Sequence, residues 1–166
     1  LDFSKIDSGK MELVSVPYNL IDLISALINM IKIRAENKGL ELKVDISENL
    51  PTVLHGDDVR MRQIIVNLLT NAVKYTFEPN KKIYITVVQK ESQVHLCIRD
   101  EGIGIPKADL SRITKAFYTG ENGRKTGEST GMGLYIAKEI CDKLGHQLVI
   151  TSETGQGTQV EVIFQS

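Results

Sequence analysis

The 166-residue sequence has almost no net charge, few cysteines and no long apolar run. Lysine and arginine together number 20 and aspartate and glutamate 21, for a formal charge of -1, which disfavours nucleic acid as a partner. Cys97 and Cys141 lie far apart without a CxxC pair, so reduced thiols in a cytoplasmic compartment are expected instead of a disulfide or zinc site. The most apolar window, 20–33, is interrupted by polar residues and is too short to span a bilayer, and no signal peptide is recognised.

Two common nucleotide-binding motifs are also missing, because neither GxxxxGKS/T nor GxGxxG occurs. The histidines, His55, His95 and His146, are isolated in the sequence and form no metal-ligand pattern. Nothing resembles a nucleophilic triad. A Walker site, a Rossmann site and a histidine metal centre are therefore not expected.

What is present is the composition of a soluble globular protein, with 42% hydrophobic and 25% charged residues and no internal repeat. A single domain of this length buries roughly two thirds of the surface that its unfolded chain exposes. Apolar periodicity predicts helices at about 19–39, 57–75 and 131–144, and strands at about 11–16, 40–46, 83–89, 94–99, 147–152 and 159–164.

A polar stripe runs along the helix predicted at about 57–75, opposite its apolar face, and consists of Gln63, Asn67, Asn71 and Lys74. Asparagine is a poor helix former, so two of them at i and i+4 need a reason. Their amide oxygens and the lysine ammonium can hold a hydrated magnesium ion and a phosphate. On its own, such a stripe is more often a solvated helix face, and both interpretations stay open at this point.

Much of the glycine lies between Asp100 and Gly133, in a polar segment that begins Asp-Glu-Gly-Ile-Gly-Ile-Pro. A long segment with little apolar content inside a compact domain is more often functional than structural, and it predicts a lid over a nucleotide. Asp100 follows a predicted strand, where its carboxylate can accept a hydrogen bond from the exocyclic amine of adenine while Gly102 and Gly104 let the backbone approach the ring. For Asp100 taken alone, a turn aspartate is the better interpretation.

The segment ends where Ser129 or Thr130 can cap the helix predicted at about 131–144. The backbone amides at the start of that helix can bind phosphate. The last two predicted strands are joined by a turn at 155–158, with the sequence Gly-Gln-Gly-Thr.

Together these motifs resemble the catalytic, ATP-binding domain of sensor histidine kinases, within the superfamily that also contains gyrase, heat-shock chaperone and mismatch-repair ATPases. Residues 67–75 are similar to the N box of the family, 100–104 to its first glycine box, 130–134 to its second and 155–158 to its third. One such motif alone would be weak, but four in order at family-like spacing are specific. The resemblance covers almost the whole chain from about Met11.

The resemblance implies an α/β fold, a two-layer sandwich of the Bergerat type in which a mixed sheet packs on three main helices and ATP lies beneath a mobile lid. Asp100 would recognise adenine, and Asn71 would coordinate Mg2+ with help from Asn67. Lys74 would contact phosphate oxygens, and Tyr75 would pack near the adenine or the ribose.

In the same family, Gly131 and Gly133 would bring helix amides to the phosphates, and Thr158 would support the adenine pocket. The residues that the resemblance implies in ATP binding are Asn67, Asn71, Lys74, Tyr75, Asp100, Gly102, Gly104, Ile105, Thr130, Gly131, Met132, Gly133, Leu134 and Thr158.

The lid departs from the commoner pattern of the family. Phe117 and Tyr118 partly match its aromatic box, but residues 118–124 do not follow it, and the lid is more similar to those of small bacterial kinases that monitor transporters. Arg124 or Lys125 would reach the γ-phosphate. The residues implied to act in catalysis are therefore Asn67, Lys74 and Arg124.

A complete kinase of this family carries its phosphoacceptor in a His-Glu-Leu-Arg-like context, which none of the histidines here has. Residues 1–10 resemble the end of the dimerisation domain and its junction, which leaves 11–166 as the catalytic domain. The expected function is to present the γ-phosphate of Mg-ATP to a histidine on a separate dimerisation domain of the same kinase, which serves a response regulator indirectly.

Hydrolysing relatives place a glutamate where Asn67 stands, and asparagine cannot act as a general base, so attack by water should be slow. Two alternatives remain: a nucleotide-binding regulatory module without kinase activity, and an ATPase or serine kinase of the same superfamily. The isolated domain is expected to be cytoplasmic and monomeric, although the family often has an upstream membrane sensor.

Overall fold

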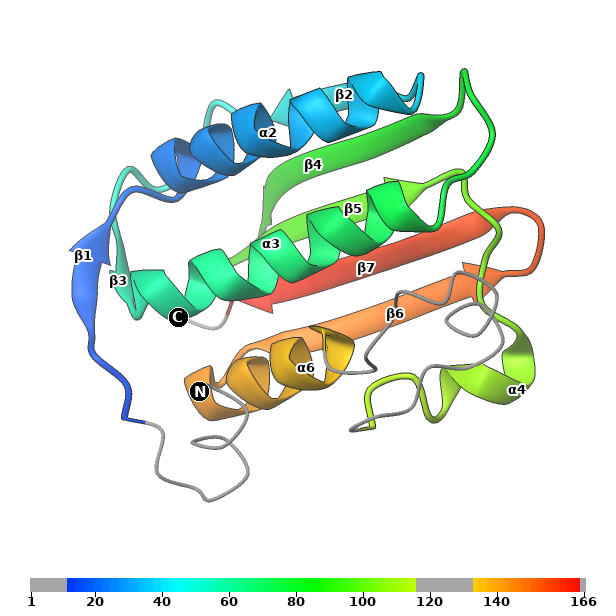
Figure 1. Cartoon of the computed structure of the whole chain (residues 1–166). Helices are drawn as coiled ribbons and strands as arrows, with labels where there is room; N and C mark the ends of the chain where they lie inside the picture. Colours follow the sequence, from blue (N-terminus) through cyan, green and yellow to red (C-terminus); the bar gives the residue numbers. More distant parts are fainter. Residues whose placement is uncertain (1–11, 116–132, 165–166) are drawn as a thin grey trace.

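The computed structural model describes residues 12–115 and 133–164, and within them the chain forms a helix layer on one face of a mixed sheet (Figure 1). The helices of the layer are α2 (Leu20–Asn37), α3 (Asp58–Lys74) and α6 (Gly133–Leu144). The sheet contains β2 (Glu41–Ile46), β4 (Lys82–Lys90), β5 (Gln93–Asp100), β7 (Gly157–Phe164) and β6 (Gln147–Glu153), in this spatial order. Only the β2–β4 pair of this sheet is parallel in the described residues.

The first two helices begin and end where local chemistry predicts. The Asn19 side chain accepts a hydrogen bond from the Asp22 amide at 3.0 Å, and the Asp57 Oδ1 atom accepts one from the Arg60 amide at 3.1 Å. Each bond satisfies an amide that has no partner inside the helix. Gly39, just after α2, has a φ of 73°, a conformation that suits glycine at the end of a helix.

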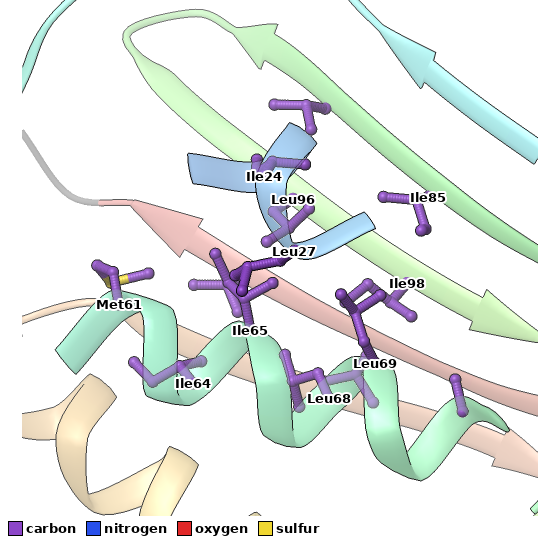
Figure 2. Close-up of a cluster of buried hydrophobic side chains, with 14 of the residues drawn as sticks. Ile24, Leu27, Met61, Ile64, Ile65, Leu68, Leu69, Ile85, Leu96 and Ile98 are labelled. Atoms are coloured by element: carbon purple, nitrogen blue, oxygen red, sulfur yellow. The ribbon is translucent and has the colours of Figure 1, made fainter. Parts of the chain in front are cut away.

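The core lies between the helices and the sheet (Figure 2). Strand alternation sends every second side chain of β4 and β5 toward the helices, where Ile85, Leu96 and Ile98 are 2% exposed or less. They meet the apolar faces of α2 and α3, and burial of each such side chain contributes about 1.5–3 kcal/mol. The helix residues that Figure 2 labels in this cluster are Ile24, Leu27, Met61, Ile64, Ile65, Leu68 and Leu69.

The strand predicted at 11–16 is wrong in its position. The strand there is β1 (Val16–Tyr18), which pairs with β3 (Leu54–Gly56), a strand that periodicity did not predict. Both strands are only three residues long, too short for alternation to be recognised, and they form a separate two-stranded ribbon in which Pro17 is tolerated because every strand there is an edge. Residue 11 itself lies outside the described residues.

A short helix, α4 (Lys107–Leu110), follows Pro106 and was not predicted either, because one turn is too short for a helical period. The helix predicted from about 131 begins at Gly133 in the described part of the chain. Val44, which alternation assigns to the covered face of β2, remains 44% exposed because β2 is the outer strand of the sheet on the α2 side.

Candidate functional site

A row of three polar residues crosses β5, β7 and β6 at one end of the sheet. Asp100 is paired with Thr158, and Thr158 is paired with Ser152. These residues have the same parity along their strands as the core residues Ile98 and Val160, so all three side chains lie on the face that the helices cover.

Asp100 is a buried carboxylate, 7% exposed, in this row. Its Oδ1 atom accepts hydrogen bonds from the Gly102 amide at 2.9 Å and from the Thr158 amide at 3.2 Å. Burial raises the pKa of Asp100 from 3.8 to about 6, against the lowering effect of the two amides. The bond from the Gly102 amide to Oδ1 is the one expected of a turn aspartate. The Oδ2 atom takes part in neither of the two bonds.

The glycines around Asp100 are required by close contacts within the protein. A Cβ atom added to Gly157, whose φ is 126°, would overlap the Asp100 carbonyl, and one added to Gly104, whose φ is 75°, would overlap the Glu153 carbonyl. The first and third glycine boxes thus pack directly on each other. Their expected role, to let the backbone approach a ligand, stays a prediction.

The asparagine stripe of α3 faces the start of α6. The Asn67 Nδ2 atom donates a hydrogen bond to the Gly133 carbonyl at 3.3 Å. A Cβ atom on Gly133 would lie 3.8 Å from Asn71 Nδ2 and 4.0 Å from Asn71 Oδ1. Asn67, Asn71 and Lys74 are all half-buried, so the stripe is not a freely solvated helix face.

The end of α3 is joined to the loop that follows Asp100, on the same side of the molecule (Figure 1). The Ile103 amide donates to the Tyr75 carbonyl at 3.1 Å. The buried Thr76 hydroxyl donates to the Ala72 carbonyl at 2.7 Å and closes the helix. The N box and the first glycine box, which lie more than twenty residues apart in the sequence, are therefore neighbours.

Two residues that sequence reasoning missed hold these segments in place. The Ser152 hydroxyl lies 2.7 Å from the Ile105 amide, 2.8 Å from the Gly157 carbonyl and 2.9 Å from the Thr158 hydroxyl. The Lys38 ammonium donates to the Val73 carbonyl at 2.6 Å and to the Lys74 carbonyl at 3.3 Å. A lone serine in a strand and a lysine after a helix carry no motif, so only their partners could have indicated these roles.

A hollow of about 320 Å³ lies at the same end of the sheet. Its lining includes Asp100, Ser152 and Thr158 and also Arg99, Thr151 and Gln159, which alternate with them along the same strands. The Arg99 guanidinium lies 4.1 Å from the centroid of the Tyr84 ring.

The chemistry of α3 suits magnesium. Among the described residues, no group of three or more His, Cys, Asp or Glu side chains is placed to hold a metal ion. Mg2+ commonly takes only one or two protein oxygens and completes its shell with water and substrate phosphates. The amide oxygens of Asn67 and Asn71, one turn apart on the same helix face, fit that requirement.

Gly133 and Leu134 are the residues of the second glycine box that the structure describes. Leu134, in the first turn of α6, is half-buried and packs against the core. The remaining lid and second-glycine-box residues lie outside the described residues; they are Phe117, Tyr118, Arg124, Lys125, Thr130, Gly131 and Met132.

Residues 56–166 match the family described as histidine kinase-, DNA gyrase B- and HSP90-like ATPases. That span includes all four motifs. The chain belongs to this family.

Several proteins similar to this chain are named as sensor proteins or histidine kinases. The chain is 34% identical over 164 residues to the sensor protein GacS of Pseudomonas syringae pv. syringae, and the matched region covers 96% of this chain and 18% of GacS. It is 34% identical over 163 residues to the signal transduction histidine-protein kinase BarA of Escherichia coli (strain K12), with 95% of this chain and 18% of BarA covered. The chain thus spans 18% of the length of these two relatives.

Solved structures of histidine kinases share the fold. Full-length ShkA in complex with AMPPNP superimposes with a TM-score of 0.84 at 26% identity, covering 98% of this chain and 33% of ShkA. The catalytic domain of histidine kinase ThkA gives a TM-score of 0.77 at 24% identity, covering 93% and 95% of the two chains. The expected α/β sandwich and the resemblance to histidine kinase catalytic domains are confirmed. None of the described helices has the length and apolar character needed to cross a membrane.

Proposed function

We propose that this chain binds Mg-ATP and, as the catalytic domain of a sensor histidine kinase, presents the γ-phosphate to a histidine on a separate dimerisation and phosphoacceptor domain of the same protein. The proposal rests on one observation above all. The loop after Asp100 is hydrogen bonded to the end of α3, the helix whose half-buried polar stripe faces the start of α6. The residues that we propose for the base thereby lie next to those that we propose for the phosphates.

Asp100 is the residue that recognises adenine in this proposal. With Oδ1 occupied by two backbone amides, Oδ2 is the oxygen that accepts the exocyclic amine of the base. A carboxylate buried among backbone donors is held in a single orientation, which favours a specific contact over a loose one. Tyr75, whose carbonyl is bonded to the same loop, packs near the adenine or the ribose.

In this proposal, α3 and the start of α6 bind the phosphates and the metal. Asn71, assisted by Asn67, offers amide oxygens to Mg2+, and Lys74 contacts phosphate oxygens. The bound Mg2+ supplies charge neutralisation at the phosphates. The first turn of α6 adds backbone amides and the positive end of the helix dipole next to the two asparagines.

Transfer to a histidine is favoured over hydrolysis by Asn67. An amide has no basic site able to take a proton from water, so this position lacks a general base. Positioning and charge neutralisation remain as the sources of catalysis, and these suit transfer to an acceptor supplied by another domain. A response regulator would then receive the phosphoryl group from that acceptor.

The proposal is tested by calorimetric titration of a non-hydrolysable ATP analogue into the chain, with and without magnesium, alongside Asp100→Asn. Magnesium-dependent binding that Asp100→Asn weakens supports it, whereas no binding to the unmodified chain contradicts it. Binding without transfer to an added phosphoacceptor domain would favour a regulatory module. Steady release of phosphate by the chain alone would favour an ATPase.

A further inference from the structure

Ser152 lies where three parts of the candidate site meet. Its hydroxyl contacts the Ile105 amide after the first glycine box, the Gly157 carbonyl in the third, and the Thr158 hydroxyl. Thr158 in turn donates its amide to Asp100 Oδ1. The row Asp100, Thr158, Ser152 is therefore one continuous hydrogen-bonded chain across three strands.

The protons in this chain can be assigned. A hydroxyl donates one hydrogen bond and accepts two. The Ile105 amide can only donate to Ser152, and the Gly157 carbonyl can only accept from it, so the single Ser152 proton goes to Gly157. The 2.9 Å contact between the two hydroxyls is then made by the Thr158 proton. All three contacts of Ser152 are satisfied in this arrangement alone.

The assignment determines what Thr158 can offer to a ligand. Its proton is committed to Ser152, so its hydroxyl has only lone pairs left. Asp100 Oδ2, next to it in the row, is also an acceptor when ionised. This wall of the site therefore presents acceptors and no donor from these two side chains.

We propose that Ser152 is a positioning residue that orients the Thr158 hydroxyl, so that the site selects a purine with an amino group at position 6 over one with a carbonyl group there. The inference rests on the proposed function, because it concerns the same base-binding wall. An amine has two protons and can donate one to each acceptor. A carbonyl would face two acceptors with no proton between them, and buried unpaired acceptors are the strongest source of discrimination.

Removal of the Ser152 hydroxyl should relax this selection. In Ser152→Ala, the Thr158 hydroxyl loses its acceptor and can rotate to donate to a 6-carbonyl group. The expected result is a fall of about three- to tenfold in the ratio of the affinities for ADP and inosine diphosphate, measured by calorimetry with Mg2+. Thr151→Ala is the matched control, since Thr151 is exposed and adjacent on the same strand but on the other face. It should leave the ratio unchanged.

Thr158→Val provides a second and independent test, because valine has the shape of threonine without the hydroxyl. This variant should lower the same affinity ratio, and Ser152→Ala added to it should change the ratio no further. If Ser152→Ala does not fold, an unaltered ratio in Thr158→Val overturns the inference.

The two proposals fail in distinguishable ways. If ADP binds the unmodified chain and binds Asp100→Asn more weakly, but the ratio of the affinities for ADP and inosine diphosphate is the same in Ser152→Ala as in Thr151→Ala, only the inference about Ser152 is contradicted. ADP that does not bind the unmodified chain contradicts the proposed function, and the inference with it.

Discussion

At the scale of single residues, the burial of Asp100 opposes the ionised form that its proposed role requires. Its burial raises the pKa of the carboxyl to about 6, which disfavours the charged form in the folded protein. Adenine recognition, as proposed, needs that charged form as an acceptor. Close to neutral pH the ionised form still predominates, but with a small margin.

The affinity for an adenine nucleotide should therefore fall as the pH is lowered through about 6. Calorimetry with ADP between about pH 7.5 and pH 5 should show a several-fold loss in the unmodified chain, as protonation removes the acceptor. Asp100→Asn should bind more weakly at every pH, since an amide NH2 facing the base is a donor. A parallel loss with pH in both proteins would assign the titration to the nucleotide phosphates instead of Asp100.

The same pKa makes Asp100 a destabilising residue at neutral pH. Between the unfolded value of 3.8 and the folded value of about 6, the folded state binds more protons than the unfolded state, so the free energy of unfolding falls as the pH rises through that window. Asparagine does not titrate, so in Asp100→Asn this residue causes no such fall in the free energy of unfolding. It should be more stable than the unmodified chain above pH 6, by up to about 3 kcal/mol, and similar to it below about pH 4.

Urea unfolding of both proteins at about pH 4 and pH 7.5 measures this difference. A stability difference that does not change with pH would contradict the raised pKa. A positive result would mean that the position is maintained for binding at the expense of stability, as expected of a functional site.

At the scale of elements, the end of α3 is held by Lys38 from the end of α2. The ammonium donates to two of the last carbonyls of α3, and it also lies 5.4 Å from the centroid of the Phe77 ring. A cation at the C-terminus of a helix is favoured by the helix dipole. Because Tyr75 follows directly, this contact also supports the side of the site formed by the N box.

Lys38→Met should lower the free energy of unfolding by about 1–2 kcal/mol, because it keeps the aliphatic stem but leaves two carbonyls without their charged donor. Lys32→Met is the matched control. Lys32 lies on α2, the helix that Lys38 follows. The side chains of Lys32 and Glu36 lie 4.0 Å apart and are each 62% exposed, and such pairs contribute at most about 0.5 kcal/mol. Equal effects of the two substitutions in urea unfolding would show that Lys38 does not hold α3.

Local signals predicted most of the elements well. Asn19 and Asp57, which stand at the starts of the helices predicted at about 19–39 and 57–75, both make capping bonds. Alternation located β4 and β5 to within a residue or two. The ribbon of β1 and β3 was misplaced or missed, because three residues are too few for a period to emerge and their stability comes from pairing between segments almost forty residues apart.

At the scale of the whole molecule, a ligand that binds only the folded state should stabilise all of it. With Mg2+ present and ADP at a hundred times its dissociation constant, the free energy of unfolding should rise by about 2.7 kcal/mol. Asn71→Ala should lose most of the magnesium-dependent part of this gain and keep the part due to adenine. A thermal unfolding series with ADP, with and without magnesium, measures both parts, and an undiminished magnesium effect would remove Asn71 as the proposed ligand.

The sequence by itself determined the helices, the longer strands and the four motifs, because caps, periodicity and glycine positions are properties of neighbouring residues. It also determined the residue types that suit adenine, magnesium and phosphate. It left two choices open. The polar stripe of α3 could be a solvated face or a binding site, and Asp100 could be a turn aspartate or a binding aspartate.

Only the tertiary structure decided which of these residues meet. Asn67 reaches Gly133 across 66 positions, and Ser152 enters the row of Asp100 through the register of three strands. Strand order, register and helix packing depend on how the whole core is filled, and a local pattern does not contain that information. For the same reason, the partners that give Ser152 and Lys38 their roles became visible only in the folded chain.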